Sequence, residues 1–394
     1  YKKKFFYILY MQLNIAFLLH AYQPWWQFPS VLEQITQESY NPIFSDLLND
    51  ERFKLTLNVN WSLVELFQHH NYNDLIALLE QLTKTKRIEF TGTSAYHAFM
   101  PLISNWMRNL QIDLQEKNMK DVFPSYNPNG FFLPEMGFSQ ELIPLLINRG
   151  YLWTITDDPP FIAHHNKNPP YNYLISSFSP LQDKQENPFV VFLRSKYWSF
   201  DRIANPFSNG FEIAKELKEQ IKNWTNGNDA YLVIAMDLET FNHHKKGYWQ
   251  FFMLNFLDAL KQHPEIKLLT LSELYFLFEK KVEDIPKGSW STSQEQYKQG
   301  NFYPLWQDTG FFKEPHNLLW QIYNLTEPYV IDNKEAELAL AKAINSCAWW
   351  QIPLGNPHLS KFGADEMVRA AEISNNPHLS EIYEFRKKLK EYHV

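Results

Sequence analysis

The sequence predicts an α/β fold, a closed or nearly closed (β/α) barrel followed by a helical domain. Short runs that are apolar on both faces recur along residues 11–285, with helix-like segments between many of them. Seven or eight such units are typical of a barrel. From about residue 286 the strand signal stops and the recognisable patterns are helical. We therefore place a barrel domain at residues 11–285 and a helical domain at residues 286–394.

The predicted strands are the apolar runs at 13–19, 54–59, 87–91, 130–133, 151–156, 189–194, 231–236 and 267–272. Helical spacing of apolar residues predicts helices at 72–85, 139–150, 211–224 and 248–263. The second of these helices begins at Ser139, a residue type favoured at helix N-caps, and stops at Gly150. The Pro-rich segment 158–172 predicts a long surface loop.

The composition narrows the class of partner. Of the 394 residues, 45% are hydrophobic, enough for a large core, and 16% are aromatic. Most of these rings belong in a core, but flat rings also stack on the apolar faces of sugars. The net charge of −7 and the lack of a long basic stripe argue against nucleic acid as the main partner. Past the N-terminal region, no stretch resembles a transmembrane helix, so we expect no membrane partner.

The N-terminal segment and the cysteine usage bear on the compartment. Cys347 is the single cysteine, so no intrachain disulfide can form, which favours a reducing environment. Residues 1–21 imitate a signal peptide, but Gln12 and Asn14 interrupt the apolar run. Cleavage after this segment would also remove His20, a candidate site residue. We expect a cytoplasmic protein, with Met11 as a natural start.

Polar and aromatic residues collect where the predicted strands end. The first strand ends at His20, the fourth leads into Glu135 and the seventh into Asp237. In a (β/α) barrel the carboxyl ends of the strands form the floor of the active site. One carboxylate after a strand is often only a helix cap, and Asp237 could be one, with His243 and His244 on a solvated loop. Convergence of several such ends on one rim favours a site.

Four segments at these strand ends carry a resemblance. "HAYQPWW" (20–26), "EFTGTSAYHAFMPLI" (89–103), the segment 131–158 and "MDLETFNHH" (236–244) resemble, in order, the first four sequence regions of glycoside hydrolase family 57. The resemblance spans roughly residues 13–280 and places a fifth region near 272–279 or 287–294. It implies an incomplete (β/α)7 barrel, a retaining mechanism on α-glucans such as starch, glycogen or maltooligosaccharides, and neither cofactor nor metal.

The resemblance also implies roles for individual residues. Glu135 stands at the position of the nucleophile and Asp237 at that of the acid/base. Glu239, His243 and His97 stand where site-lining or substrate-binding residues are expected. The first region departs from the family: Tyr22 precedes Gln23-Pro24 where a histidine is usual, and only the earlier His20 remains. The departure leaves the two carboxylates in place and concerns the contacts with the donor sugar.

The chemistry can be argued from the residues themselves. Glycoside cleavage needs a proton for the leaving oxygen and a carboxylate on the opposite face, and two close carboxyl groups supply both because their like charges raise one pKa. Tryptophans near the rim could stack on glucose rings, although core packing is equally expected of each. These are Trp25, Trp26, Trp61 and Trp290, with Trp349 and Trp350 from the helical domain able to close over the cleft.

Two other functions fit the same barrel. "TDDPP" (156–160) resembles the aspartate motif of metal-dependent polysaccharide deacetylases. Such a site needs two histidines about four residues apart on one helix face, and none of the 13 histidines forms such a pair. The second alternative is a non-catalytic carbohydrate-binding protein, against which the two carboxylates argue. The sequence leaves open whether water or another sugar accepts the glycosyl group.

Overall fold

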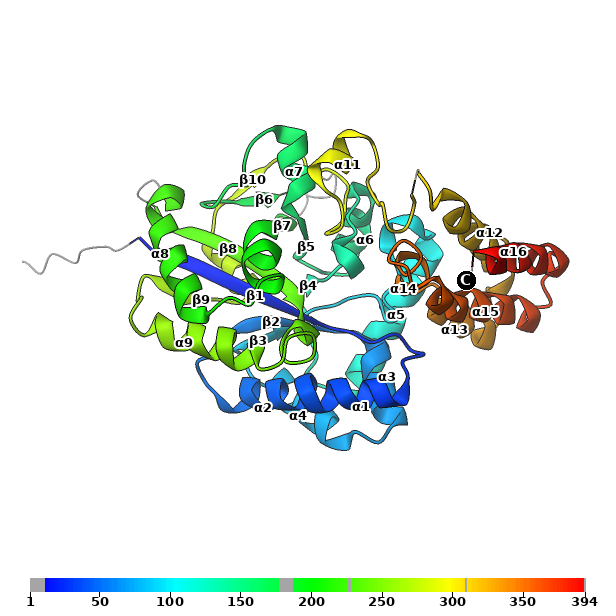
Figure 1. Cartoon of the computed structure of the whole chain (residues 1–394), viewed down its shortest axis with the longest axis horizontal. Coiled ribbons are helices and arrows are strands. Elements are labelled where there is room, and N and C mark those ends of the chain that lie inside the picture. The colour runs from blue at the N-terminus through cyan, green and yellow to red at the C-terminus, as the bar shows by residue number, and fades with distance from the viewer. Residues whose placement is uncertain (1–10, 177–186, 226–227, 309, 393–394) are drawn as a thin grey trace, which may run out of the picture.

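The computed structural model describes residues 11–176, 187–225, 228–308 and 310–392. Its strands alternate with helices through the first three quarters of the chain, and helices follow (Figure 1). The strands are β1 (Leu13–Ala21), β2 (Leu55–Val59), β3 (Ile88–Phe90), β4 (Gly130–Phe131), β5 (Trp153–Asp157), β6 (Leu174–Ser176), β7 (Val190–Arg194), β8 (Ala230–Asp237), β9 (Ile266–Leu268) and β10 (Lys280–Val282).

One sheet is parallel and has β1 at its centre. Its order is β3-β2-β1-β8, and β9 pairs with the first residues of β1. All nine residues of β1 are buried, as expected of a strand covered on both faces. The alternation seen in the sequence therefore becomes a parallel sheet. Residues 13–21 of the segment that imitates a signal peptide form its central strand, and residues 1–10 of that segment lie outside the described residues (Figure 1).

The second sheet has the order β10-β6-β7-β5-β4, with one antiparallel contact between β6 and β7. It joins the first sheet at two places. A parallel bridge between Gly92 and Phe131 links the end of β3 to β4. On the other side, the Ser195 amide donates to the Val233 carbonyl at 3.0 Å, linking the end of β7 to β8. The two sheets are thus joined through the ends of β3 and β4 and through the ends of β7 and β8.

The α-helices of the first 300 residues mostly lie between the strands in sequence. They are α1 (Pro29–Ile35), α2 (Asn41–Asn49), α3 (Trp61–His69), α4 (Asn73–Thr83), α5 (Asn105–Val122), α6 (Ile143–Asn148), α7 (Asp158–His165), α8 (Gly210–Thr225), α9 (Asn255–Leu260), α10 (Leu271–Leu277) and α11 (Gln294–Lys298). No helix in the described parts of the chain is both long enough and apolar enough to cross a bilayer.

Several local predictions were wrong. The expected loop at 158–172 begins as helix α7, because Pro159 and Pro160 occupy its first turn, where a missing N–H costs no hydrogen bond. The expected strand at 267–272 is only β9, and a capping box between Thr270 and Glu273 starts α10. Ser139 makes no side-chain cap bond; a 3₁₀ turn separates it from α6.

A second group of corrections concerns short strands and the start of the helical region. Strands β6 and β10 were not predicted, since three-residue runs carry little periodic signal. Between β10 and residue 312, the one α-helix in the described residues is α11. The helices that follow are α12 (Lys313–Val330), α13 (Lys334–Ala343), α14 (Cys347–Trp350), α15 (Pro357–Ile373) and α16 (Leu379–Glu391).

These last helices pack on one another at one end of the molecule (Figure 1). Their buried side chains, such as Leu319 and Met367, belong to the same hydrophobic cluster as Leu19 and Phe256 of the sheet region. The helices are thus joined to the rest of the chain by a continuous core. Helix α14 comes close to the strand ends, because Ala98 forms an antiparallel bridge with Asn345 just before it.

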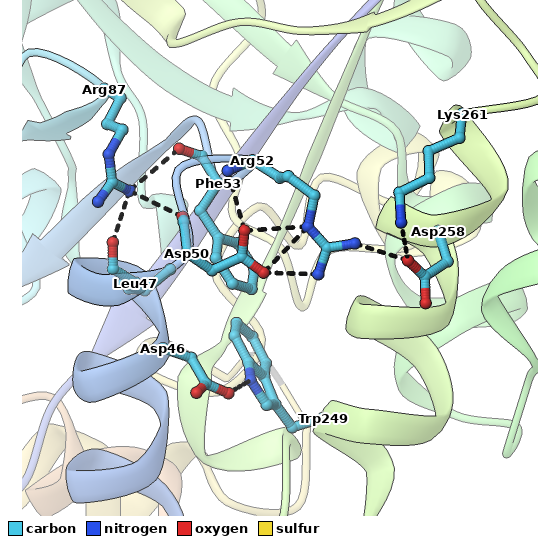
Figure 2. A network of polar contacts seen from close by, with 9 residues as sticks. All are labelled: Asp46, Leu47, Asp50, Arg52, Phe53, Arg87, Trp249, Asp258 and Lys261. Atoms are coloured by element: carbon cyan, nitrogen blue, oxygen red, sulfur yellow. Dashed lines mark hydrogen bonds and ion pairs between the residues drawn. The ribbon is translucent and has the colours of Figure 1, made fainter.

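A polar network lies at the amino ends of β2 and β3, opposite the strand ends discussed so far (Figure 2). Arg87 donates to the carbonyls of Leu47 at 2.6 Å, of Asp50 at 3.2 Å and of Phe53 at 3.3 Å, which closes the end of α2. Arg52 pairs with Asp50 and with Asp258 of α9, each at 2.6 Å. We call Asp50, Arg52, Arg87 and Asp258 the amino-end network; it ties helices to strands.

Candidate active site

Three acidic residues lie at the carboxyl ends of the strands. Asp237 is the last residue of β8 and pairs in register with His20 of β1, so both side chains are at the same edge. Glu239 follows in a 3₁₀ turn (Leu238–Thr240), and Glu135 lies in another turn (Pro134–Met136) after β4. Glu135 has φ = 59°, a conformation that non-glycine residues adopt at a cost and that is enriched at functional sites.

Both carboxylate oxygens of Glu135 accept hydrogen bonds. The Ser346 hydroxyl donates to Oε1 at 2.7 Å, and the Trp290 indole N–H donates to Oε2 at 2.7 Å. Burial raises the pKa of Glu135 to about 7, and the charge of Asp237 adds to the rise. The two hydrogen bonds oppose it. Glu135 is therefore a desolvated carboxylate whose orientation is fixed from both sides.

Asp237 has a different environment. Among the described residues, no hydrogen bond reaches its carboxylate, and its residue is only partly buried. Burial raises the pKa of Asp237 to about 6, while the charge of Arg194 opposes the shift. Arg194 is itself fixed, since it donates to the Ala235 carbonyl at 2.7 Å and to Asp157 at 2.9 Å. Asp237 therefore faces a fixed positive charge but keeps its own oxygens available.

Glu239 is held by protein donors. The Tyr22 amide donates to its Oε1 at 3.2 Å, Gln23 donates to the same oxygen at 3.4 Å, and the Tyr40 hydroxyl donates to it as well. Burial raises the pKa of Glu239 to about 8, with the charge of Asp237 as the second cause. Glu239 fixes the loop after β1 against the turn after β8.

A stack of rings covers the floor of the site. The Tyr22 ring lies 4.0 Å from the His97 ring, and the His97 ring 4.9 Å from that of His20, all nearly parallel. Burial lowers the pKa of His20 to about 4 and lowers that of His97 as well, so both imidazoles are neutral at pH 7. The Tyr22 hydroxyl lies 3.5 Å from the Cys347 sulfur.

Two cavities meet at the carboxylates. One is about 440 Å³ and extends past Tyr22 and Trp26; the other is about 560 Å³ and extends past Arg194 and Phe200. Their shared lining residues are Glu135, Asp237, His244, Trp290 and Trp350. A bond placed at the carboxylates would thus have room for a substituent on either side.

A comparison with known families decides what kind of protein this is. The sequence model of "Glycosyl hydrolase family 57" matches residues 7–286. The chain belongs to glycosyl hydrolase family 57.

Individual relatives in the family are distant. A 4-alpha-glucanotransferase from Thermococcus litoralis is 22% identical over 406 residues, covering 91% of this chain and 57% of that protein. An alpha-amylase from Pyrococcus abyssi is 26% identical over 152 residues, covering 39% of this chain and 23% of that protein. The chain thus spans little more than half the length of the first relative and about a quarter of the second.

Solved structures share the fold. The Thermococcus litoralis 4-alpha-glucanotransferase has a TM-score of 0.74 at 20% identity, covering 92% of this chain and 60% of that one. A family 57 branching enzyme from Pyrococcus horikoshii has a TM-score of 0.67 at 14% identity, covering 98% of this chain and 95% of that one. This chain therefore shares its α/β fold with solved members of the family.

The site residues predicted from the sequence fall into two groups. Eight line the first cavity: His20, Gln23, Trp26, His97, Glu135, Asp237, Glu239 and Trp290. The other three do not line either cavity. Trp61 is buried at the start of α3, and Trp25 packs against the hydrophobic cluster. His243 pairs with Glu38 at 2.7 Å, and it is the adjacent His244 that lines both cavities.

Other residues of the site were not predicted as such. Tyr22 and His244 lie inside the family motifs and line the first cavity. The sequence predicts Trp349 and Trp350 only as residues that close over the cleft; Trp350 lines the cavity, and Trp349 is fully buried. Ser346 and Cys347 had no signal at all, because their place in the site depends on the packing of α14. Among the described residues, no group of three or more His, Cys, Asp or Glu side chains could hold a metal ion.

Proposed function

We propose that this protein is a retaining glycosidase or glycosyltransferring enzyme acting on α-1,4-glucans, with Glu135 as the nucleophile and Asp237 as the acid/base. The observation that carries the proposal is the pair of desolvated carboxyl groups at the junction of two cavities. The relatives named 4-alpha-glucanotransferase and alpha-amylase supply the substrate class.

We propose in addition that seven strands form the incomplete barrel expected of the family, and that residues 286–394 form a helical domain. The ring would run β1, β2, β3, β4, β5, β7 and β8 in chain order. The bridge at Gly92 and the bond from Ser195 support its two joints between the sheets.

In the first step Glu135 attacks the anomeric carbon. A lone pair of its carboxylate forms the glycosyl ester bond, and the glycosidic bond breaks. The departing oxygen keeps the electron pair of the broken bond and accepts the proton of Asp237. In the second step Asp237 removes a proton from water or from a sugar hydroxyl, and the oxygen of that acceptor attacks the same carbon. The ester bond breaks, and its electron pair returns to Glu135. Two displacements retain the α configuration.

The hydrogen bonds support this division of roles. Two donors favour the ionised form of Glu135, whereas no described residue donates to Asp237. Without a sugar, the lower pKa of Asp237 would let it ionise first. A bound sugar removes water from the partly exposed Asp237 more than from Glu135, which is already hydrogen-bonded by protein, and this raises the pKa of Asp237 relative to that of Glu135.

Incubation with maltooligosaccharides of one defined length tests the proposal. Shorter products alone would indicate hydrolysis, and a ladder above and below the starting length would indicate transfer. Product NMR before mutarotation should show the α-anomer first. A β-anomer as first product would overturn the retaining mechanism whatever the acceptor.

The alternative functions have their own outcomes. A metal-dependent deacetylase would lose activity on exhaustive treatment with EDTA and regain it with zinc, whereas we expect activity to survive. A non-catalytic carbohydrate-binding protein would bind glucan and release no product. We also propose a cytoplasmic location, supported by the single cysteine, Cys347, which is buried and free, and a glucan partner rather than nucleic acid or membrane.

A further inference from the structure

Ser346 connects the nucleophile to the helical region of the chain. Its backbone amide donates to the His97 carbonyl at 2.9 Å, and Asn345 before it forms a bridge with Ala98. Its hydroxyl donates to Oε1 of Glu135. Ser346 is fully buried and lines neither cavity. A donor from 211 residues further along the chain thus reaches the carboxylate from the protein side.

The hydrogen-bond pattern around Ser346 fixes the direction of each bond. When Glu135 is ionised its Oε1 can only accept, so the hydroxyl gives its one proton to Glu135 and its oxygen accepts from Nδ1 of His97 at 2.8 Å. His97 is neutral, because burial lowers its pKa, and its proton is therefore on Nδ1. The chain His97–Ser346–Glu135 ends on the one oxygen Oε1.

The other oxygen of Glu135 has a different neighbour. Oε2 accepts from Trp290, and the Trp290 side chain lines both cavities. Oε2 is thus the oxygen on the side where a sugar can bind, while Oε1 faces buried protein. When a carboxylate becomes an ester, one oxygen forms the new bond and becomes a poor acceptor, and the other becomes the carbonyl and keeps its hydrogen bonds.

We propose that Ser346 is a positioning residue that holds Oε1 of Glu135 as the carbonyl oxygen of the glycosyl ester and so directs Oε2 to the anomeric carbon. This inference rests on the proposed role of Glu135 as nucleophile. The bond from Ser346 persists through both steps, whereas the bond from Trp290 is weakened when the ester forms and re-forms when Oε2 leaves. The carboxylate loses its negative charge as the ester forms, so the bond from Ser346 acts by fixing the orientation of Oε1.

The ester carbonyl itself reports the hydrogen bond. A 5-fluoro-glucosyl fluoride should trap the glycosyl-enzyme, and isotope-edited infrared spectra with ¹³C-labelled glutamate isolate its C=O stretch. In Ser346→Ala this stretch should move to higher frequency, and in Trp290→Phe it should stay where it is. A shift in Trp290→Phe without one in Ser346→Ala would overturn the inference and make Oε1 the attacking oxygen. Because Trp290→Phe tests the other oxygen, the result does not depend on Ser346→Ala folding.

Kinetics supply a second readout. Loss of a hydrogen bond to a charged group should lower kcat/KM of Ser346→Ala about 10- to 100-fold. The acidic limb of the pH profile of kcat/KM should move to higher pH in this variant, because the hydrogen bond from Ser346 lowers the pKa of Glu135. Ser346→Thr keeps the hydroxyl and should therefore restore part of kcat/KM and part of the position of the acidic limb. Ser360→Ala is the matched control, since Ser360 is equally buried and its hydroxyl has no partner among the described residues.

The trapping experiment separates the two proposals. If mass spectrometry finds no sugar on the peptide with Glu135, the proposed nucleophile is wrong. If the sugar is on Glu135 but Ser346→Ala changes neither the carbonyl frequency nor the acidic limb, the nucleophile stands and the role of Ser346 is structural only.

Discussion

Acidic residues at the two ends of the strands have opposite environments. At the carboxyl ends, burial raises the pKa of Glu135, of Asp237 and of Glu239 to about 7, 6 and 8. At the amino ends, hydrogen bonds from Arg52 lower the pKa of Asp50, and those from Lys261 and Arg52 lower that of Asp258. The carboxyl ends of β4 and β8 thus hold acids that can exchange protons near neutral pH, whereas Asp50 and Asp258 stay ionised.

The difference has opposite consequences for stability. A carboxyl group with a raised pKa favours the folded state below its unfolded pKa, and this contribution is lost as the pH rises through the folded value. A carboxyl group with a lowered pKa contributes stability above its unfolded pKa, and this is lost as the pH falls through the folded value. The stability contribution of the site acids should thus be lost as the pH rises from 4.5 toward 8. The contribution of the amino-end network should be lost only in acid. Substitutions at the two ends should separate activity from stability.

The largest effect is expected for Glu135→Gln. The amide keeps the shape but cannot attack, so kcat on a maltooligosaccharide should fall by about 10⁴-fold or more. Removing a buried acid should leave the melting temperature at pH 8 unchanged or higher. Glucan binding, measured by calorimetry, should persist. Full activity in this variant would contradict the assignment of the nucleophile.

Asp237→Asn should lose less, and the loss should depend on the leaving group. On maltooligosaccharides the missing proton donor should lower the rate by about 10²- to 10⁴-fold. On a nitrophenyl glycoside the first step should survive better, because that leaving group needs little protonation. Added azide should then displace Glu135 from the β-linked glycosyl ester and give an α-glycosyl azide. A β-glycosyl azide would indicate a single direct displacement and would contradict the covalent intermediate.

Arg87→Met tests the amino-end network. It removes the donor of several backbone carbonyls at the end of α2, so the free energy of unfolding should fall by about 2–3 kcal/mol in urea titrations. The kcat of the folded fraction should stay within about 2-fold of the wild type. Arg369→Met is the control: it breaks the pairs of the exposed Arg369 with Glu335 of α13 and Glu366 of α15, and it should cost under about 1 kcal/mol. A large loss of kcat in Arg87→Met would contradict the expectation that the amino-end network affects stability and not activity.

The sequence predicts a feature at either end of the strands only where the residues that form it are neighbours in the sequence. Strands and the carboxylates that follow them are contiguous in sequence, so the apolar runs before Glu135 and Asp237 predicted the rim. The adjacent histidines show a limit, because backbone geometry in the turn decides that His244 and not His243 faces the cavities.

Donors brought in by tertiary packing gave no signal in the sequence. Ser346 reaches Glu135 across 211 positions, and Arg194 is fixed by Asp157 from another strand. Arg87 closes a helix that ends nearly forty residues before it, which no periodicity shows. Local patterns thus predicted which carboxylates lie at the strand ends, and packing decides what holds them.

Glu239→Gln should change the pH dependence of stability. Between pH 4.5 and about 8 the folded state keeps the proton of Glu239 and the unfolded state loses it, so wild-type stability falls with pH. Glutamine removes this contribution and should make the decline shallower by up to about 1.4 kcal/mol per pH unit. Its amide oxygen can still accept from Tyr40 and from the Tyr22 amide. An unchanged slope in urea titrations at several pH values would show that Glu239 is ionised in the fold.

Asp50→Asn should give the smallest effect, with the opposite dependence on pH. Arg52 lowers the pKa of Asp50 from its ordinary 3.8, so the ion pair contributes above pH 3.8 and is lost as the pH falls through the lower folded value. Both side chains are partly exposed, and water screens the pair, so the cost at pH 7 should be about 0.2–1 kcal/mol. It should shrink at about 0.5 M salt. Urea titrations at pH 7 and at pH 3 measure both changes; a cost that grows toward pH 3 would mean that the amino-end network does not hold Asp50 ionised.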